Sequence, residues 1–209
     1  MKSDCNKKDL ILTTFKQSIL KDGYSKVSIN SLTAQCNISK GSFYTYFSSK
    51  DEMLLTILDE YKNLLKRIME ECTEKSKNMD EFVENYIKYR LNLNDEELEF
   101  ELVLANLLKN FENVGNKNLY KLYKICDIHI DTIELNLKKY TSIPEDQIKT
   151  VARIIEGIRI EFHFRDTIEI NEDFFRIKNL DEIKTLLYSD EMVKNRELVI
   201  KSIKKILKK

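Results

Sequence analysis

Apolar residues recur along most of the chain at intervals of three and four positions, which is the spacing of one face of an α-helix. Ile11, Phe15 and Ile19 show this spacing first, and Gly23 stands where a glycine commonly ends a helix. Only 4 Gly and 1 Pro interrupt the chain, and no stretch alternates apolar and polar positions as a strand does. We therefore expect an all-α fold of about nine helices.

The expected helices are short near the amino terminus and longer beyond it. The first covers residues 8–21, the second runs from Ser28 to Gln35, and the third runs from Lys40 to about Tyr46. Asn37 lies in the turn between the last two, where its short amide tolerates a left-handed conformation. Further helices are expected over residues 79–92, 96–111, 117–140, 145–166 and 191–207. The segment from Asp166 to Leu187 is read as a loop that could contain a short helix around residues 181–188.

A long fourth helix is expected to begin with a capping box. Ser49 and Glu52 have the spacing at which a hydroxyl and a carboxylate satisfy each other's free amides. The apolar residues that follow share a single helical face: Leu54, Ile57, Leu58, Tyr61, Leu65, Ile68 and Cys72. This helix is expected to connect the first helices to the rest of the chain as a continuous rod.

Charge is unevenly distributed, although Lys plus Arg and Asp plus Glu both number 35. Residues 1–50 contain eight Lys and three Asp, residues 51–193 contain 20 Lys and Arg against 31 Asp and Glu, and residues 194–209 contain seven against one. A basic amino-terminal module favours a polyanion as partner, whereas an acidic body would be repelled by one. We therefore predict one domain over residues 1–50 and a second over residues 51–209.

Two short helices joined by a tight turn on a basic module are what recognition of the DNA major groove requires. Phe43 and Phe47, four apart, would anchor the third helix. Its tip and outer side then remain exposed: Lys40, Gly41, Ser42, Tyr44, Thr45 and Tyr46. The phenolic hydroxyls could bind phosphates and Thr45 could reach a base edge or a thymine methyl. The alternative is that these aromatic residues and lysines form an ordinary solvated surface.

The runs from Gly23 to Leu32 and from Cys36 to Lys50 resemble the amino-terminal signature of the tetracycline-repressor (TetR) family of bacterial transcription regulators. The resemblance covers residues 8–55 and implies a helix-turn-helix domain followed by a variable helical domain. It further implies phosphate contacts from Ser28, Tyr44 and Lys50, and groove contacts from Lys40, Ser42, Thr45 and Tyr46. Thr33 replaces a usual alanine and Asn37 replaces the turn glycine, and both substitutions are compatible with the fold.

The helix expected at 145–166 is apolar on two opposite sides. Ile148, Val151, Ile155, Ile158 and Phe162 line one side, and Gly157, Ile160 and Phe164 fall on the other. Both sides must be covered, either within one protomer or partly by a second copy. The resemblance favours a homodimer paired through the last two long helices, with an interface comprising Gly157, Ile160, Phe164, Val199, Ile203 and Ile206. Such a dimer would bind a pseudo-palindromic double-stranded DNA operator.

The resemblance also implies a small-molecule effector of unknown identity within the body. The candidate pocket residues are Tyr86, Tyr89, Phe100, Phe111, Tyr123, Cys126 and His129. Cys126 and His129 could be half of a metal site, but no second such pair is near in sequence, so a packed cysteine beside a hydrogen-bonded histidine is favoured. For the polar stripe Glu156, Arg159 and His163, water or ion pairing is favoured over a ligand.

Other classes of protein find little support. The chain has no glycine-rich phosphate loop and no G-x-S-x-G or H-E-x-x-H motif. We therefore expect that the protein is not an enzyme and that it has no catalytic residues, no cofactor and no metal. Four scattered cysteines and the lack of a long apolar stretch indicate a cytoplasmic protein without a membrane partner. The remaining alternative is a protein-interaction module that uses the helix-turn-helix surface, and the basic tip favours DNA over it. A repressor role follows from the resemblance alone.

Overall fold

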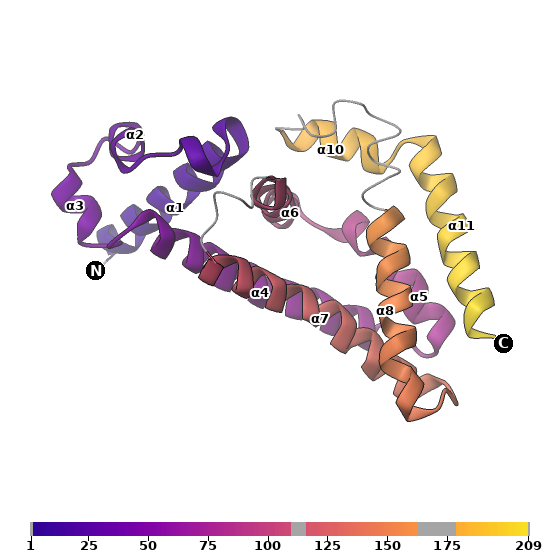
Figure 1. Ribbon diagram of the computed structural model, residues 1–209. Coiled ribbons are helices and arrows are strands. Elements are labelled where there is room, and N and C mark those ends of the chain that lie inside the picture. The colour runs from indigo at the N-terminus through magenta and orange to yellow at the C-terminus, as the bar shows by residue number, and fades with distance from the viewer. Residues whose placement is uncertain (1, 110–115, 163–178, 209) are drawn as a thin grey trace. The chain divides into compact units, whose positions relative to one another are not determined.

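The computed structural model describes residues 2–109, 116–162 and 179–208. Every regular element within these ranges is helical, as the sequence pattern predicts (Figure 1). Two short 3₁₀ helices connect α-helices: η1 (Tyr24–Lys26) follows the first α-helix and η2 (Tyr89–Asn92) follows the fifth. The α-helices are α1 (Lys2–Asp22), α2 (Ile29–Gln35), α3 (Lys40–Tyr44), α4 (Lys50–Glu74), α5 (Met79–Lys88), α6 (Asp95–Lys109), α7 (Asn116–Tyr140), α8 (Glu145–Glu161), α10 (Leu180–Leu187) and α11 (Asp190–Leu207).

Local signals at the helix ends act largely as expected. Gly23 ends α1 with a φ of 83°, and Asn37 adopts a φ of 51° in the turn before α3. The capping box of α4 differs in one respect. The Glu52 amide donates to Ser49 Oγ at 3.1 Å, but the Glu52 carboxylate accepts from the amide and hydroxyl of Ser48, both at 2.6 Å. The box therefore closes one residue earlier than predicted, and these hydrogen bonds lower the pKa of Glu52.

The chain packs as two compact units. Unit 1 comprises Met1–Asn63 and Glu99–Lys124, and unit 2 comprises Leu64–Leu98 and Ile125–Lys209. Because α4, α6 and α7 each contribute residues to both units, neither unit is a continuous segment. The functional division into residues 1–50 and 51–209 stays a prediction.

The core of unit 1 holds α1, α2, α3 and the first half of α4 together. Phe15, Leu32 and Phe43 are fully buried there. The Tyr24 hydroxyl donates to Asp51 Oδ1 at 2.6 Å and so links η1 to the first turn of α4. The start of α7 packs along the same helix, where Lys121 Nζ lies 2.5 Å from Asp59 Oδ2.

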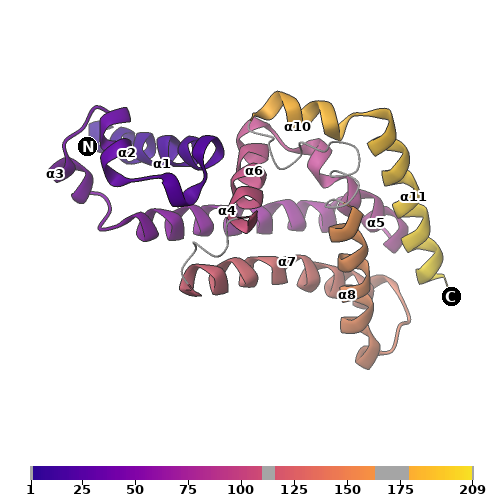
Figure 2. The same ribbon diagram turned by 45° about the horizontal axis from the view of Figure 1, so that its top comes forward.

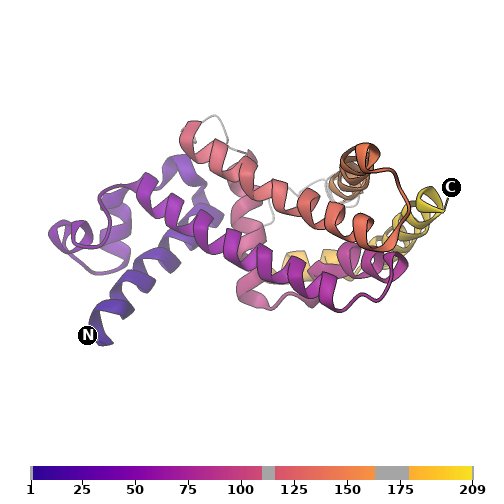
Figure 3. The same ribbon diagram turned by 90° about the horizontal axis from the view of Figure 1, so that it is seen from below.

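In unit 2, α11 packs against α5, α8 and α10 (Figure 2). The inner side of α8 is buried at Ile148 and Ile155, and α11 buries Ile200 and Ile203. The second halves of α4 and α7 lie side by side (Figure 3). Asn136 Nδ2 of α7 donates to Thr73 Oγ1 of α4 at 2.9 Å. No helix in the described ranges is long and apolar enough to cross a membrane.

Candidate functional site

Helix α3 is fixed to unit 1 by its apolar side. Phe43 is fully buried and Phe47 is 2% exposed, with ring centroids 6.2 Å apart. Ser39 caps the helix by accepting from the Ser42 amide at 3.1 Å. These contacts confirm the expected anchors and cap, and they hold the opposite side of α3 toward solvent.

The outer side of α3 carries most of the residues predicted to meet DNA. Lys40, Gly41 and Tyr44 are exposed, Tyr44 to 54%, whereas Ser42 and Tyr46 are half-buried. Thr45 is exposed, but its hydroxyl donates to the Ser42 carbonyl at 2.7 Å. It therefore presents a methyl group and oxygen lone pairs, which suit a thymine methyl or a donor on a base.

Packing within the protein does not explain the glycine at position 41. A Cβ atom at Gly41 would have Ser39 Oγ, 3.8 Å away, as its nearest neighbour, which is ordinary contact. Alanine is the better helix former by about 1 kcal/mol. A side chain is therefore missing where the folded protomer has room for one, as expected if another molecule approaches the backbone there.

Two residues that the family resemblance places at phosphates also have structural roles. Ser28 is exposed and caps α2 by accepting from the Ser31 amide at 3.1 Å. Lys50 Nζ donates to the carbonyls of Tyr24 and Val27 at 3.1 and 3.2 Å and lies 4.2 Å from the centre of the Tyr24 ring. Desolvation lowers the pKa of Lys50. Its ammonium holds η1 against α4, so replacing it would disturb the amino-terminal helices α1 to α3, called the head, as well as any phosphate contact.

A second surface feature is a set of exposed apolar residues on α8 and α11, two helices that pack against each other; together they are called the apolar face of α8 and α11. On α8, Ile154 is 48% and Ile160 51% exposed, and a Cβ at Gly157 would meet nothing within 4 Å. On α11 the exposed apolar residues are Val193, Leu198 and Ile206. Ile154, Val193 and Leu198 were not predicted from the sequence, although Ile154 lies about one helical turn from the predicted Gly157.

One predicted interface residue needs correction. Ile203 has no exposed surface because it points into the core of its own unit, so it cannot contact a second copy. Val199 is half-buried and Ile206 is exposed, which keeps both available. Phe164 lies outside the described residues.

A buried polar cluster joins α5, α7 and α8 within unit 2. Arg159 Nε and Nη2 donate to the two carboxylate oxygens of Glu156 at 2.8 and 2.6 Å. The Tyr86 hydroxyl donates to the same carboxylate and lies 3.2 Å from His129 Nδ1. All four side chains are buried, so of the two outcomes favoured from the sequence, water and ion pairing, Glu156 and Arg159 show ion pairing, within one protomer; His163 lies outside the described residues.

The cluster determines the protonation of its histidine. Because the Tyr86 hydroxyl proton is used on Glu156, the phenolic oxygen is left to accept, and His129 must carry its proton on Nδ1. Desolvation, with the positive charges of Arg159 and Arg90, lowers the pKa of His129 well below its usual value. The same burial raises the pKa of Tyr86. His129 is therefore neutral at pH 7.

This arrangement predicts a pH-dependent stability. The folded-state pKa of His129 lies below the unfolded value of about 6.5, so the unfolded chain binds this proton first as the pH falls. Below pH 6.5, wild type should lose up to about 1.4 kcal/mol of unfolding free energy per pH unit from this group, and His129→Gln should lack that loss. Urea unfolding of both proteins at pH 7, 6 and 5 measures the difference, and parallel pH profiles would contradict it.

The predicted ligand residues do not all come together. Tyr86, Tyr89 and His129 are neighbours, with ring centroids of Tyr89 and His129 6.0 Å apart. Phe100 belongs to unit 1, where it contacts Tyr61 and the Lys16 ammonium. Tyr123 is exposed, and so is Cys126, which is therefore not the packed cysteine expected beside His129. Phe111 lies outside the described residues. The described ranges contain no cluster of three His, Cys, Asp or Glu side chains placed to hold a metal ion.

Comparison with known sequences identifies the amino-terminal segment. Residues 11–57 match the family described as "Bacterial regulatory proteins, tetR family". The HTH-type transcriptional regulator YuxN of Bacillus subtilis is 40% identical over 55 residues, which are 26% of this chain and 19% of YuxN. An HTH-type transcriptional regulator in the lacX 3' region of Lactococcus lactis is 36% identical over 84 residues, 38% of this chain and 43% of that protein. The matches thus span less than half of these relatives.

Solved structures extend the likeness to the whole fold. Reduced NemR of Escherichia coli superposes with a TM-score of 0.67 at 16% identity and covers 96% of this chain and 97% of its own. A TerR/AcrR-family transcriptional regulator of Aquifex aeolicus gives 0.62 at 21% identity, with 96% and 99% covered. The Aquifex structure and the two curated relatives are described as transcriptional regulators.

Proposed function

We propose that the chain, whose residues 11–57 match the tetR family of bacterial regulatory proteins, is a dimeric DNA-binding repressor of transcription released by a small molecule. The observation that carries the DNA-binding part is the geometry of α3. Its apolar side is buried through Phe43 and Phe47, while Lys40, Gly41 and Tyr44 stand exposed on the other side.

In this proposal, α3 enters the major groove with its basic tip first. The Tyr44 hydroxyl binds a phosphate, which provides affinity without sequence information, and the Lys40 ammonium lies at the groove, close to the phosphates that border it. Thr45 offers its methyl group to a thymine, and the bare backbone at Gly41 allows close approach. Ser42 and Tyr46, half-buried beside them, complete the contact surface.

Dimerisation would use the apolar face of α8 and α11. A twofold axis places the same face of both copies in contact, so each exposed isoleucine or leucine is covered by its partner's surface. The two copies of α3 then read half-sites about one helical turn or more apart, on a pseudo-palindromic operator. Burying an exposed apolar face is the main free-energy gain of such an interface.

Release by an effector requires that the small molecule bind the DNA-incompetent arrangement better than the DNA-bound one. The coupling is reciprocal, so operator DNA must weaken effector binding by the same factor. Helix α4 is the expected lever, because it runs without interruption from Lys50 beside the head to Glu74 in unit 2.

The DNA-binding part is tested by a salt titration. We expect the protein to bind a fluorescent duplex of the DNA upstream of its own gene tightly and a random duplex weakly. The affinity for both duplexes should fall as the salt concentration rises. Lys40→Ala with Tyr44→Ala should weaken both and reduce the slope of log K against log salt by about 0.9 for each phosphate that the variant no longer neutralises. Fluorescence anisotropy at several salt concentrations measures this.

The matched control is Lys21→Ala, which removes the same charge from the last turn of α1. It should leave the preference for the operator duplex intact. Unchanged affinity of the Lys40 and Tyr44 variant would remove α3 from the interface. Binding that is insensitive to salt would instead favour the alternative, a module that binds another protein.

A further inference from the structure

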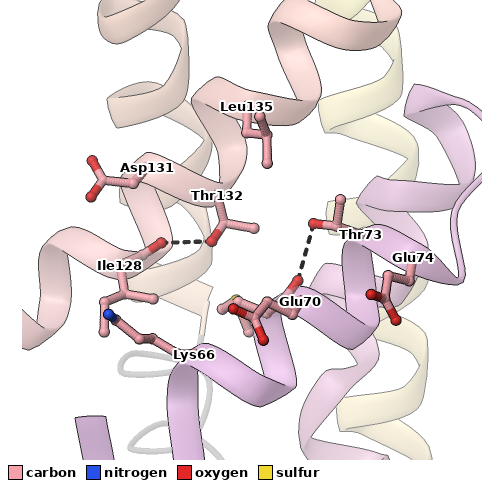
Figure 4. A pocket seen from close by; sticks show the side chains of 9 residues that line it. Lys66, Glu70, Thr73, Glu74, Ile128, Asp131, Thr132 and Leu135 are labelled. Atoms are coloured by element: carbon pink, nitrogen blue, oxygen red, sulfur yellow. Dashed lines mark hydrogen bonds between the residues drawn. The ribbon is translucent and has the colours of Figure 1, made fainter. Parts of the chain in front are cut away.

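Unit 2 contains an open groove of about 380 Å³ between the second halves of α4 and α7 (Figure 4). This volume is within the range of small-molecule sites. It lies apart from the polar cluster of Tyr86, His129, Glu156 and Arg159, none of which lines it. The surface is therefore a separate candidate for the effector.

The inside of the groove is apolar. Met69 forms part of it and is 1% exposed, while Leu135 at its edge is 57% exposed. Thr73 and Thr132 face each other across it, and each hydroxyl donates to a carbonyl of its own helix, at 3.0 and 2.7 Å (Figure 4). The hydroxyl protons of Thr73 and Thr132 are therefore already engaged in hydrogen bonds within the protein. The interior offers contact with carbon atoms and no side-chain hydroxyl donor.

The rim of the groove is acidic. Glu70 and Glu74 come from α4 and Asp131 from α7, and no salt bridge with another described residue engages any of the three. Their neighbour Glu71, outside the groove, is paired instead with Arg67 at 2.9 Å and Lys75 at 3.0 Å. Lys66 supplies the single positive charge among the described lining residues. The groove therefore combines an apolar interior with a net charge of −2 from its lining side chains.

We propose that this groove binds an organic cation with an apolar body, and that this cation is the effector; the second part rests on the proposed function. The apolar body would cover Met69, Ile128 and Leu135, and the positive charge would lie between the rim carboxylates. A neutral molecule would lose the second contribution, and an anion would be repelled. Binding of such a cation would cover most of the Leu135 side chain and would place the positive charge close to the carboxylates of Glu70, Glu74 and Asp131.

The position of the groove provides a route to the DNA-binding head. Its two walls are α4 and α7, and the same two helices meet again in unit 1, where Lys121 Nζ binds Asp59 and the Leu55 carbonyl. The first turn of α4 is tied to the head by the Tyr24 to Asp51 hydrogen bond. A ligand that changes the spacing of α4 and α7 in the groove would act directly on the helix that carries the head.

The test uses two probes of the same shape and opposite charge, tetraphenylphosphonium and tetraphenylborate, with the full-length protein in isothermal titration calorimetry. Tetraphenylphosphonium should bind about tenfold or more tightly than tetraphenylborate. Glu70→Gln with Glu74→Gln and Asp131→Asn should weaken the phosphonium by about tenfold or more. The control, Glu96→Gln with Asp146→Asn and Glu191→Gln, changes the net charge equally on exposed acids outside the groove and should leave its affinity unchanged.

A second variant guards against misfolding of the first. Ile128→Trp keeps every charge and fills the groove, and it should abolish phosphonium binding while far-UV circular dichroism stays that of wild type. Equal binding of the two probes, or an equal loss in the control variant, would overturn the proposed site. If wild type binds no phosphonium and the triple variant changes the association state of the protein, the groove is a protein contact. That result would also overturn the proposed cation site.

The effector role is read separately from the binding. Phosphonium at saturating concentration should raise the operator dissociation constant about tenfold, a typical allosteric coupling, and the triple variant should lose this response. Binding without any effect on operator affinity would overturn the effector role. If wild type binds no DNA at all, the proposed function fails while the calorimetric result still decides whether the groove takes cations.

Discussion

Replacing Ile160 by glutamate should convert the protein to monomers and lower its operator affinity about 10³-fold or more, to the level of non-specific binding. Ile160 is 51% exposed beside the open backbone of Gly157, so the folded protomer tolerates a charge there. In a twofold interface, however, two unpaired carboxylates would be desolvated. Sedimentation equilibrium gives the association state, and fluorescence anisotropy gives the affinity.

Tyr123→Glu is the control for this change. Tyr123 is 66% exposed on α7, outside the apolar face of α8 and α11, so the variant carries the same charge on an exposed aromatic position. It should remain dimeric. An intact dimer of Ile160→Glu would show that α8 and α11 do not form the interface, and circular dichroism would confirm that both variants are folded.

Glu156→Ala should lower the free energy of unfolding by about 3–5 kcal/mol, because it leaves the Arg159 guanidinium buried without its carboxylate. Both side chains are nearly inaccessible, 4% and 6% exposed, and their bidentate contact is the centre of the cluster. The Tyr86 hydroxyl would lose its acceptor in the same step. Urea unfolding monitored by circular dichroism measures the loss.

The double variant Glu156→Leu with Arg159→Met separates the effect of losing the ion pair from the effect of losing side-chain packing. It removes both charges and keeps apolar volume, so much of the stability should return. Glu145→Gln at the exposed start of α8, whose partner Lys138 lies 3.3 Å away, should cost less than about 0.5 kcal/mol. If the losses of unfolding free energy from replacing Glu156 alone and Arg159 alone add up to the loss in the double variant, the two residues are not coupled.

The helices and the DNA-binding head could be read from the sequence because their signals are local. The apolar period, Gly23 after α1, Asn37 in the turn and Ser39 before α3 each act within a few residues, and the structure agrees with all of them. The outer side of α3 followed from the spacing of Phe43 and Phe47 alone. The same holds for the stripe along α4, whose apolar residues are all buried.

The surfaces of unit 2 could not be read in this way. Spacing placed Ile203 and Ile206 on one side of α11, yet the first is fully buried and the second is 47% exposed. A helical period defines which residues share a face, but how much of that face is covered depends on neighbours far away in sequence. Leu198 and Ile154 were missed for the same reason.

The sequence by itself therefore determined the all-α fold, the order of the helices and the head with its basic tip, because capping, turns and periodicity are interactions between near neighbours. It did not fix every helix end, since α1 begins at Lys2 and not at residue 8, and α3 ends at Tyr44 and not at Tyr46. Only the tertiary structure decided that Glu156 and Arg159 are buried with Tyr86 and His129, and that Lys50 braces the head. It also decided that acids of α4 and α7 surround one apolar groove. These features bring together residues up to 70 positions apart, and their burial and charge environment exist only once the helices have packed.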